Sequence, residues 1–114
     1  MRRFKGDMIL EDRVIWQDCQ VSTAVDHLIL CVPDLDRGAD EIRRSLGGSS
    51  VEGGRHTGLG THNRIVPLGG NYLELLAVAD SVEALENSFG AWAAERSVMP
   101  VGVDALCLRV PDLD

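Results

Sequence analysis

The stretch "DHLILCVPDLD" (Asp26–Asp36) returns near the end of the chain as "DALCLRVPDLD" (Asp104–Asp114). The two stretches share eight of eleven residues at a constant offset of 78 positions. Self-similarity of this kind is typical of proteins that contain repeated structural units. Each copy is rich in aliphatic residues and ends on a turn-forming Pro-Asp pair, which predicts a strand followed by a turn. We therefore interpret the chain as one unit followed by the opening strand of a second.

The first of these strands, over residues 25–32, is predicted to be buried on both faces. On a two-residue period His27 shares a face with Val25, Ile29 and Cys31, so its imidazole lies among apolar side chains. A histidine in that position is either a core residue with a satisfied hydrogen bond or a ligand, and the period alone leaves both interpretations open.

A helix is predicted directly after Pro33. Asp34 or Asp36 can cap its N-terminus, and Gly47–Gly48 ends it. Its apolar positions fall at helical spacing: Leu35, Ala39, Ile42 and Leu46.

Three more strands are predicted, over residues 49–52, 61–68 and 72–79. Gly69–Gly70 is a two-residue hairpin signal, so the last two of them should pair antiparallel. The glycine-rich stretch "GGRHTGLG" (residues 53–60) matches no phosphate-binding spacing. We interpret it as a flexible loop and a candidate lid, with His56 near the mouth of the site.

A second helix is predicted over residues 81–100, capped by Asp80 or Ser81. Its inward stripe should be Val82, Leu85, Phe89 and Trp92. A strand over residues 101–110 then repeats the strand over residues 25–32. The fold class that follows is α+β, with the order β-α-β-β-β before the second helix.

Composition limits the classes of function. A chain of 114 residues with 45% hydrophobic residues can bury one core. Its formal charge of −7 argues against nucleic acid as a partner, and no apolar run reaches the length of about 20 residues that a membrane helix needs. The three cysteines are widely spaced and lack a CxxC pair, which favours free thiols in a reducing cytoplasm.

The order of elements resembles the vicinal-oxygen-chelate superfamily, and most closely its glyoxalase-like domains, of the glyoxalase, bleomycin-resistance and extradiol-dioxygenase type. The motifs that carry the resemblance are "DHLILCVPDLDRGADEI", "GLGTHNRIVPLGGNYLELLAV" and "DALCLRVPDLD". The resemblance implies two β-α-β-β-β modules that join edge to edge into a cup, so the mixed sheet of this chain should form half of a cup. It divides the chain into an N-terminal extension (1–24), a first module (25–80), a linker helix (81–100) and the first strand of an incomplete second module (101–114).

The resemblance also implies a divalent metal at the cup floor, held by a His in the first strand and a Glu in the fourth. The matching residues are His27 and Glu74, and Glu74 is the expected catalytic residue. Imidazole and carboxylate ligands suit zinc, nickel, manganese or iron. A carboxylate within "NYLELLAV" is also costly to bury unless a metal or another partner offsets it, although an edge position facing solvent would explain it too.

Further site residues are expected on the third strand and on the repeated strand. His62 and Asn63 point in opposite directions, so at most one of them faces the cup. If His62 does, it is a third metal ligand in a two-histidine, one-carboxylate set. We expect Asn63 to bind substrate, and Arg109 to bind an anionic substrate group unless it is an exposed edge charge.

The repeat departs from the family pattern at one decisive position, because Ala105 stands where His27 stood. The expected site is therefore incomplete within this chain. Either the chain is a fragment of a two-module protein, or a homodimer completes the cup. The predicted function is a metal-dependent lyase, isomerase or dioxygenase that acts on a small oxygenated metabolite. The alternatives are a metal-free module that binds a small molecule and an inactive fragment.

Overall fold

The computed structural model describes residues 8–10, 13–15 and 23–111. Most of the expected N-terminal extension, and the last three residues of the second repeat, lie outside the described residues. The chain divides into two units, residues 25–108 and residues 1–24 with 109–114. In the smaller unit two short strands, β1 (Met8–Leu10) and β2 (Arg13–Ile15), pair antiparallel.

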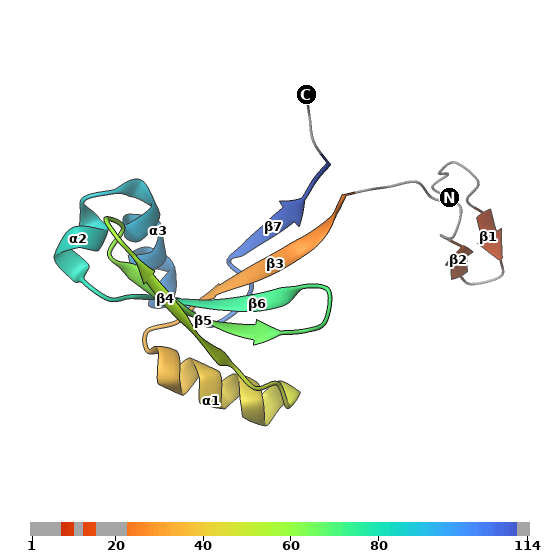
Figure 1. The fold of residues 1–114 in the computed structure, drawn as a ribbon, viewed down its shortest axis with the longest axis horizontal. Coiled ribbons are helices and arrows are strands. Elements are labelled where there is room, and N and C mark those ends of the chain that lie inside the picture. Colours follow the sequence, from red (N-terminus) through yellow and green to blue (C-terminus); the bar gives the residue numbers. More distant parts are fainter. Residues whose placement is uncertain (1–7, 11–12, 16–22, 112–114) are drawn as a thin grey trace. The chain divides into compact units, whose positions relative to one another are not determined.

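A mixed sheet of five strands, in the order β4-β5-β6-β3-β7, forms the centre of the larger unit (Figure 1). The strands are β3 (Ala24–Cys31), β4 (Val51–His56), β5 (Thr61–Pro67), β6 (Tyr72–Val78) and β7 (Ala105–Arg109). β3 and β6 run parallel, whereas β5 is antiparallel to both β4 and β6. This arrangement confirms the α+β class, the mixed sheet and the antiparallel hairpin predicted at Gly69–Gly70.

Helix α1 (Leu35–Leu46) begins and ends where the sequence predicts. The Asp34 side chain accepts a hydrogen bond from the Arg37 N–H at 2.9 Å. Gly47 adopts a left-handed conformation with φ of 77°, and its N–H donates to the carbonyl of Arg43, which stops the helix. The short connection from β3 leaves α1 packed on the sheet.

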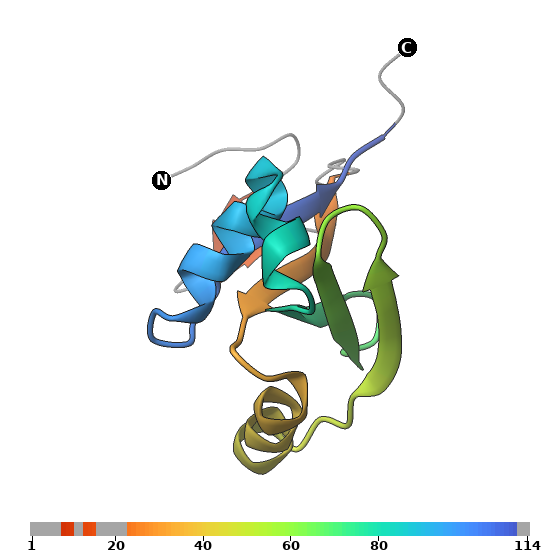
Figure 2. The same cartoon turned by 90° about the vertical axis from the view of Figure 1, so that its left-hand side faces the viewer.

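Each face of the sheet has its own apolar cluster. Helix α1 lies on one side of the sheet, and the segment after β6 lies on the other (Figures 1 and 2). We call the first the α1 face, because Ala39 and Ile42 of α1 pack there. Its buried residues are Leu30, Val32, Val66, Leu73, Leu75 and Ala77. We call the second the cup face. Its buried cluster is Ile29, Cys31, Leu76 and Ala93, with Phe89 and Trp92 against it.

The segment predicted as one linker helix is two helices, α2 (Ser81–Leu85) and α3 (Ser88–Ser97), so that prediction is wrong. Asn87 separates them, because its side chain accepts from the Gly90 N–H at 2.7 Å and so caps a new helix. The predicted inward stripe is confirmed only in its second half. Val82 and Leu85 are exposed, whereas Phe89 and Trp92 pack on the cup face.

Asp104 fixes the beginning of β7 against β3. Its backbone N–H donates to the carbonyl of Ile29, and its carboxylate accepts from the Cys31 N–H, both at 2.8 Å. Arg96 of α3 donates to the other carboxylate oxygen at 2.8 Å, and this hydrogen bond raises the pKa of the guanidinium. A buried carboxylate that accepts from two donors stabilises the point where the repeated strand joins the sheet.

In the part of the chain that the structure describes, no helix has the length and apolarity required to cross a bilayer.

Candidate functional site

The parallel pairing of β3 and β6 brings His27 and Glu74 together on the cup face. In the register His27 lies opposite Tyr72, and Ile29 lies opposite Glu74. The imidazole Nε2 and the carboxylate Oε1 are 3.3 Å apart, and the two side chains are only 16% and 11% exposed. The two residues singled out by the sequence therefore meet in a largely buried position.

The ring of His27 is held from two sides. Its Nδ1 lies 2.8 Å from Oδ2 of Asp26, and the ring stacks on Tyr72 with centroids 4.6 Å apart and planes within 5°. A carboxylate is an acceptor, so Nδ1 carries the proton that donates to Asp26. In a neutral ring Nε2 is then an acceptor, and it faces a second acceptor, Oε1 of Glu74. Such a pair is favourable only when a proton or a metal cation lies between the two atoms.

The other oxygen of Glu74 is engaged by Asn63. Asn63 Nδ2 donates to Oε2 at 2.7 Å, and Asn63 Oδ1 accepts from the Gly54 N–H at 2.8 Å. These two bonds settle which end of the amide is oxygen. Because Oε2 is occupied, Oε1 is the oxygen of Glu74 left to face His27. Glu74 is buried, and the amide offsets part of the cost of burying its charge.

A β-bulge makes room for Asn63. The register between β4 and β5 shifts between Glu52 and Arg55, so β4 contains one residue more than its partner there. A Cβ atom at Gly53 would lie 1.9 Å from Oδ1 of Asn63, a distance that no side chain can occupy. Gly53, the first residue of "GGRHTGLG", therefore permits this close approach.

His56 lies in the site, and the prediction that it belongs to a flexible lid is wrong. It is the last residue of β4 and pairs with Thr61. Its Nε2 is 3.3 Å from Asn63 Nδ2 and 3.9 Å from Glu74 Oε2. The following turn is also fixed, since the carbonyl of Gly60 accepts from the backbone N–H groups of Ala79 and Asp80. The missed signal is the Gly-Gly pair, which is typical of a bulge within a strand.

Two further polar groups border the cluster. Burial raises the pKa of the Cys107 thiol, and the negative charges of Glu74 and Asp26 raise it further. Burial, Asp26 and Glu74 likewise raise the pKa of Tyr72. Both groups are therefore kept protonated, so neither is an activated nucleophile.

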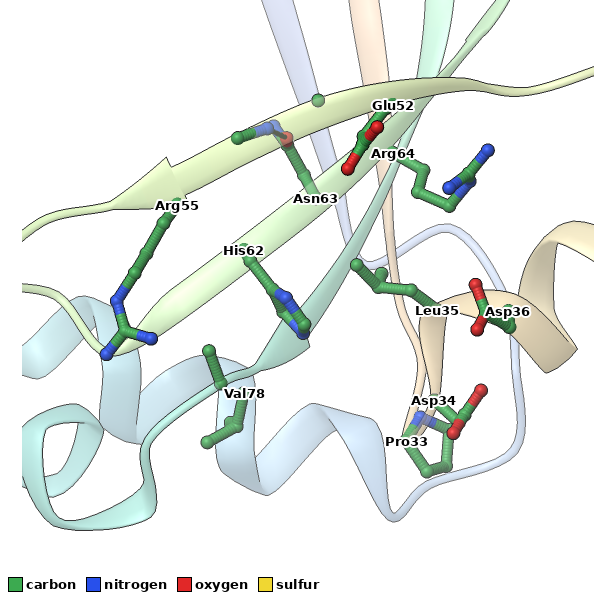
Figure 3. A pocket seen from close by; sticks show the side chains of 13 residues that line it. Pro33, Asp34, Leu35, Asp36, Glu52, Arg55, His62, Asn63, Arg64 and Val78 are labelled. Atoms are coloured by element: carbon green, nitrogen blue, oxygen red, sulfur yellow. Dashed lines mark hydrogen bonds between the residues drawn. The ribbon is translucent and has the colours of Figure 1, made fainter.

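His62 does not join this cluster. It pairs with Ala77, and the alternation of β5 places it on the α1 face. Figure 3 shows His62 and Asn63 leaving the strand in opposite directions. His62 lines a hollow of about 580 Å³ that also includes Leu35, Arg64 and Val78 (Figure 3). Arg109, the last residue of β7, is exposed, and its role in substrate binding stays a prediction.

The residues at the site meet part of the requirements of a metal centre. His27 and Glu74 offer one nitrogen and one oxygen at a suitable separation, with partners that orient both groups. Within residues 8–10, 13–15 and 23–111, however, no three His, Cys, Asp or Glu side chains gather closely enough to enclose an ion. The chain thus fits two ligands of a metal centre and does not complete the centre.

A comparison with protein families matches residues 25–114 to the family described as "Glyoxalase-like domain". A comparison with curated proteins finds no match. Among solved structures, the methylmalonyl-CoA epimerase from Mycobacterium tuberculosis aligns with 78% of this chain and 56% of its own, at 23% identity and a TM-score of 0.59.

Other solved structures agree on the fold. A hypothetical protein from Staphylococcus aureus aligns with 79% of this chain and 37% of its own, at 23% identity and a TM-score of 0.64. A methylmalonyl-CoA epimerase from Streptomyces coelicolor, solved with 2-nitronate-propionyl-CoA, aligns with 73% of this chain and 57% of its own, at 20% identity and a TM-score of 0.57. The chain thus spans little more than half the length of these epimerases.

Proposed function

Because the chain belongs to the glyoxalase-like domain family, we propose that it supplies half of a divalent-metal site that binds adjacent oxygens of a small metabolite. The observation that carries this proposal is the pair of acceptors, His27 Nε2 and Glu74 Oε1, that face each other at 3.3 Å. Nitrogen and oxygen donors of this kind suit zinc, nickel, manganese or iron. When bound, such an ion supplies Lewis-acid polarisation of the substrate oxygens.

The residues of the chain have distinct roles in this proposal. His27 and Glu74 are the ligands. Asp26 holds the Nδ1–H of His27, which keeps the Nε2 lone pair directed at the ion. Asn63 holds Oε2 of Glu74, which leaves Oε1 as the coordinating oxygen. We also propose that Asn63 binds substrate through the second lone pair of its amide oxygen, and that Arg109 binds an anionic substrate group.

The remaining ligands would come from a second module. We propose that residues 25–80 form a first module, that residues 81–100 link it onward, and that residues 101–114 open a second. Ala105 cannot supply a ligand, so a second copy of the chain, or further polypeptide, is required to complete the centre. A homodimer is the form we propose, because it brings a second His27 and Glu74.

We propose isomerisation next to a carbonyl as the first activity to assay. Lyase and dioxygenase chemistry use the same family site and are the next candidates. The support for isomerisation is the likeness to epimerases, one of which was solved with methylmalonyl-CoA and NH4+. In this scheme Glu74 contributes by holding the ion in place. The free thiols of Cys31 and Cys107 support a reducing, cytoplasmic location.

A metal-free binding module is the second candidate function. It is favoured by the finding that the described residues hold no group of three ligating side chains. In that case a proton on His27, rather than a metal, would lie between Nε2 and Glu74.

The test is elemental analysis of purified protein, after reconstitution with zinc, nickel, manganese and iron, together with its mass by light scattering. A dimer that holds about half a metal ion or more per chain supports the proposal. The ion should be lost in His27→Leu and kept in His62→Leu. A protein that holds no metal after reconstitution, and binds small acyl thioesters in the presence of a chelator, contradicts it and supports the binding module.

A further inference from the structure

The side chain of Asn63 has a second donor, and that donor is directed at His56. One N–H of the amide donates to Glu74, and the amide oxygen accepts from Gly54. The remaining N–H has His56 Nε2 within 3.3 Å. An amide that uses its oxygen and both of its N–H groups in this way has one orientation only.

His56 itself can accept that bond in only one tautomer. Its Nδ1 lies 2.8 Å from Oγ1 of Thr61, which is fully buried. If Nδ1–H donates to the Thr61 hydroxyl, Nε2 is free to accept from Asn63, and every group in the chain of contacts is satisfied. The ring is further held by Phe89 of α3, whose centroid is 6.3 Å away at an interplanar angle of 65°.

The bulge in β4 determines that His56 faces this way. Glu52 pairs with Arg64 before the bulge, and His56 pairs with Thr61 after it. Without the extra residue, Arg55 would lie opposite Thr61 and would face the cup, because side chains alternate along a strand. The bulge therefore places His56, rather than Arg55, beside Glu74.

We propose that His56 is a positioning residue: its Nε2 holds the Asn63 amide, and the amide in turn holds Glu74 with Oε1 toward His27. His56 acts through hydrogen bonding and touches neither substrate nor metal. Its effect on metal binding rests on the proposed function, whereas its effect on Asn63 does not.

Three variants separate this role from simple packing. His56→Leu keeps an apolar contact with Phe89 and removes the acceptor. His56→Gln offers an oxygen near the position of Nε2 and restores the acceptor. Arg55→Leu changes the neighbouring residue on the same strand, whose side chain is half-exposed and makes only long ion pairs, at 3.7 and 3.9 Å, with Glu83 and Asp80.

The first measurement is the NMR signal and the hydrogen-exchange rate of the Asn63 side-chain amide in metal-free protein. We expect His56→Leu to speed this exchange about tenfold, and we expect His56→Gln and Arg55→Leu to leave it within about twofold of the wild type, since one hydrogen bond of about 1.4 kcal/mol is removed. If His56→Leu behaves as the wild type, or if His56→Gln behaves as His56→Leu, the proposal is overturned.

The second measurement is the affinity for the metal that the wild type binds, obtained by competition with a chelating dye. His56→Leu should weaken it about tenfold, with rescue in His56→Gln. A wild type that binds no metal contradicts the proposed function alone, because the exchange of the Asn63 amide still decides the role of His56.

Discussion

The two faces of the sheet are built from alternate residues of the same strands, yet they hold different kinds of side chain. On the α1 face, β6 presents Leu73, Leu75 and Ala77, which are buried in an apolar cluster. On the cup face, the same strand presents Glu74, which contacts His27 and Asn63. The α1 face is therefore apolar throughout its buried cluster, whereas the cup face combines an apolar cluster with buried polar groups, which are costly to bury.

The difference between the two faces predicts that the largest loss of stability follows truncation of a buried side chain on the α1 face. Leu75 is 0% exposed, so Leu75→Ala should lower the free energy of unfolding by about 2–5 kcal/mol through lost burial and a cavity. Urea denaturation followed by circular dichroism measures it. Leu68→Ala, at a position that is 51% exposed, is the matched control and should cost far less. Equal losses in the two variants would show that the α1 face is not the stabilising core.

On the cup face, the Glu74→Gln variant should change function more than stability. The amide keeps an oxygen for Asn63 and loses the charge that would bind a cation. We expect metal affinity to fall about 100-fold, equivalent to about 2.8 kcal/mol, with little change in the urea midpoint. Glu52→Gln, which removes an exposed carboxylate from β4, is the control. Unchanged affinity in Glu74→Gln would remove Glu74 from the metal site.

The cup face also contains a buried thiol that makes stability depend on pH. Burial, together with Asp104, raises the pKa of Cys31 from 9.0 to about 12. Between those values the unfolded chain has lost a proton that the folded chain keeps, so stability is complete below pH 9 and falls as the pH rises. The decline attributable to one proton is at most about 1.4 kcal/mol per pH unit.

Urea denaturation from pH 7 to 11 measures that decline. Cys31→Ala cannot ionise at this position, so its stability should fall less steeply above pH 9 than that of the wild type. Below pH 8 the two slopes should agree. Parallel slopes over the whole range would mean that the thiol ionises as easily in the folded chain as in the unfolded one.

The fold was largely predictable because it depends on local patterns. The cap at Asp34, the stop at Gly47 and the Gly69–Gly70 hairpin are all short-range signals, and the structure confirms them. The break at Asn87 was missed because an apolar period of helical spacing runs across it. The Asn87 side chain caps a new helix in spite of that period, and a Cβ atom at Gly90 would lie 2.4 Å from the carbonyl of Ala84 and 2.5 Å from that of Leu59, so the first turn of this helix requires a glycine.

The site was predictable only in part, for a related reason. The resemblance singled out His27 and Glu74, which do meet. It could not supply Asp26, because neighbours on a strand ordinarily face opposite ways, nor His56, because a one-residue bulge reverses the alternation of β4. Contacts of this kind depend on register, and register is settled by the whole sheet rather than by a motif.

The smallest expected effect is the one that separates the two faces most sharply. His62 and His27 are both strand histidines among apolar neighbours, and the sequence allowed either to bind metal. Only His27 has a carboxylate on each nitrogen, whereas His62 faces the hollow beside Leu35 (Figure 3). His62→Leu should therefore change metal affinity by less than about twofold and stability by less than about 0.5 kcal/mol. The same substitution at His27 should abolish metal binding, and both are measured by dye competition. If His62→Leu also lost the metal, the ion would have to be bound on the α1 face, and the assignment of function to the cup face would be reversed.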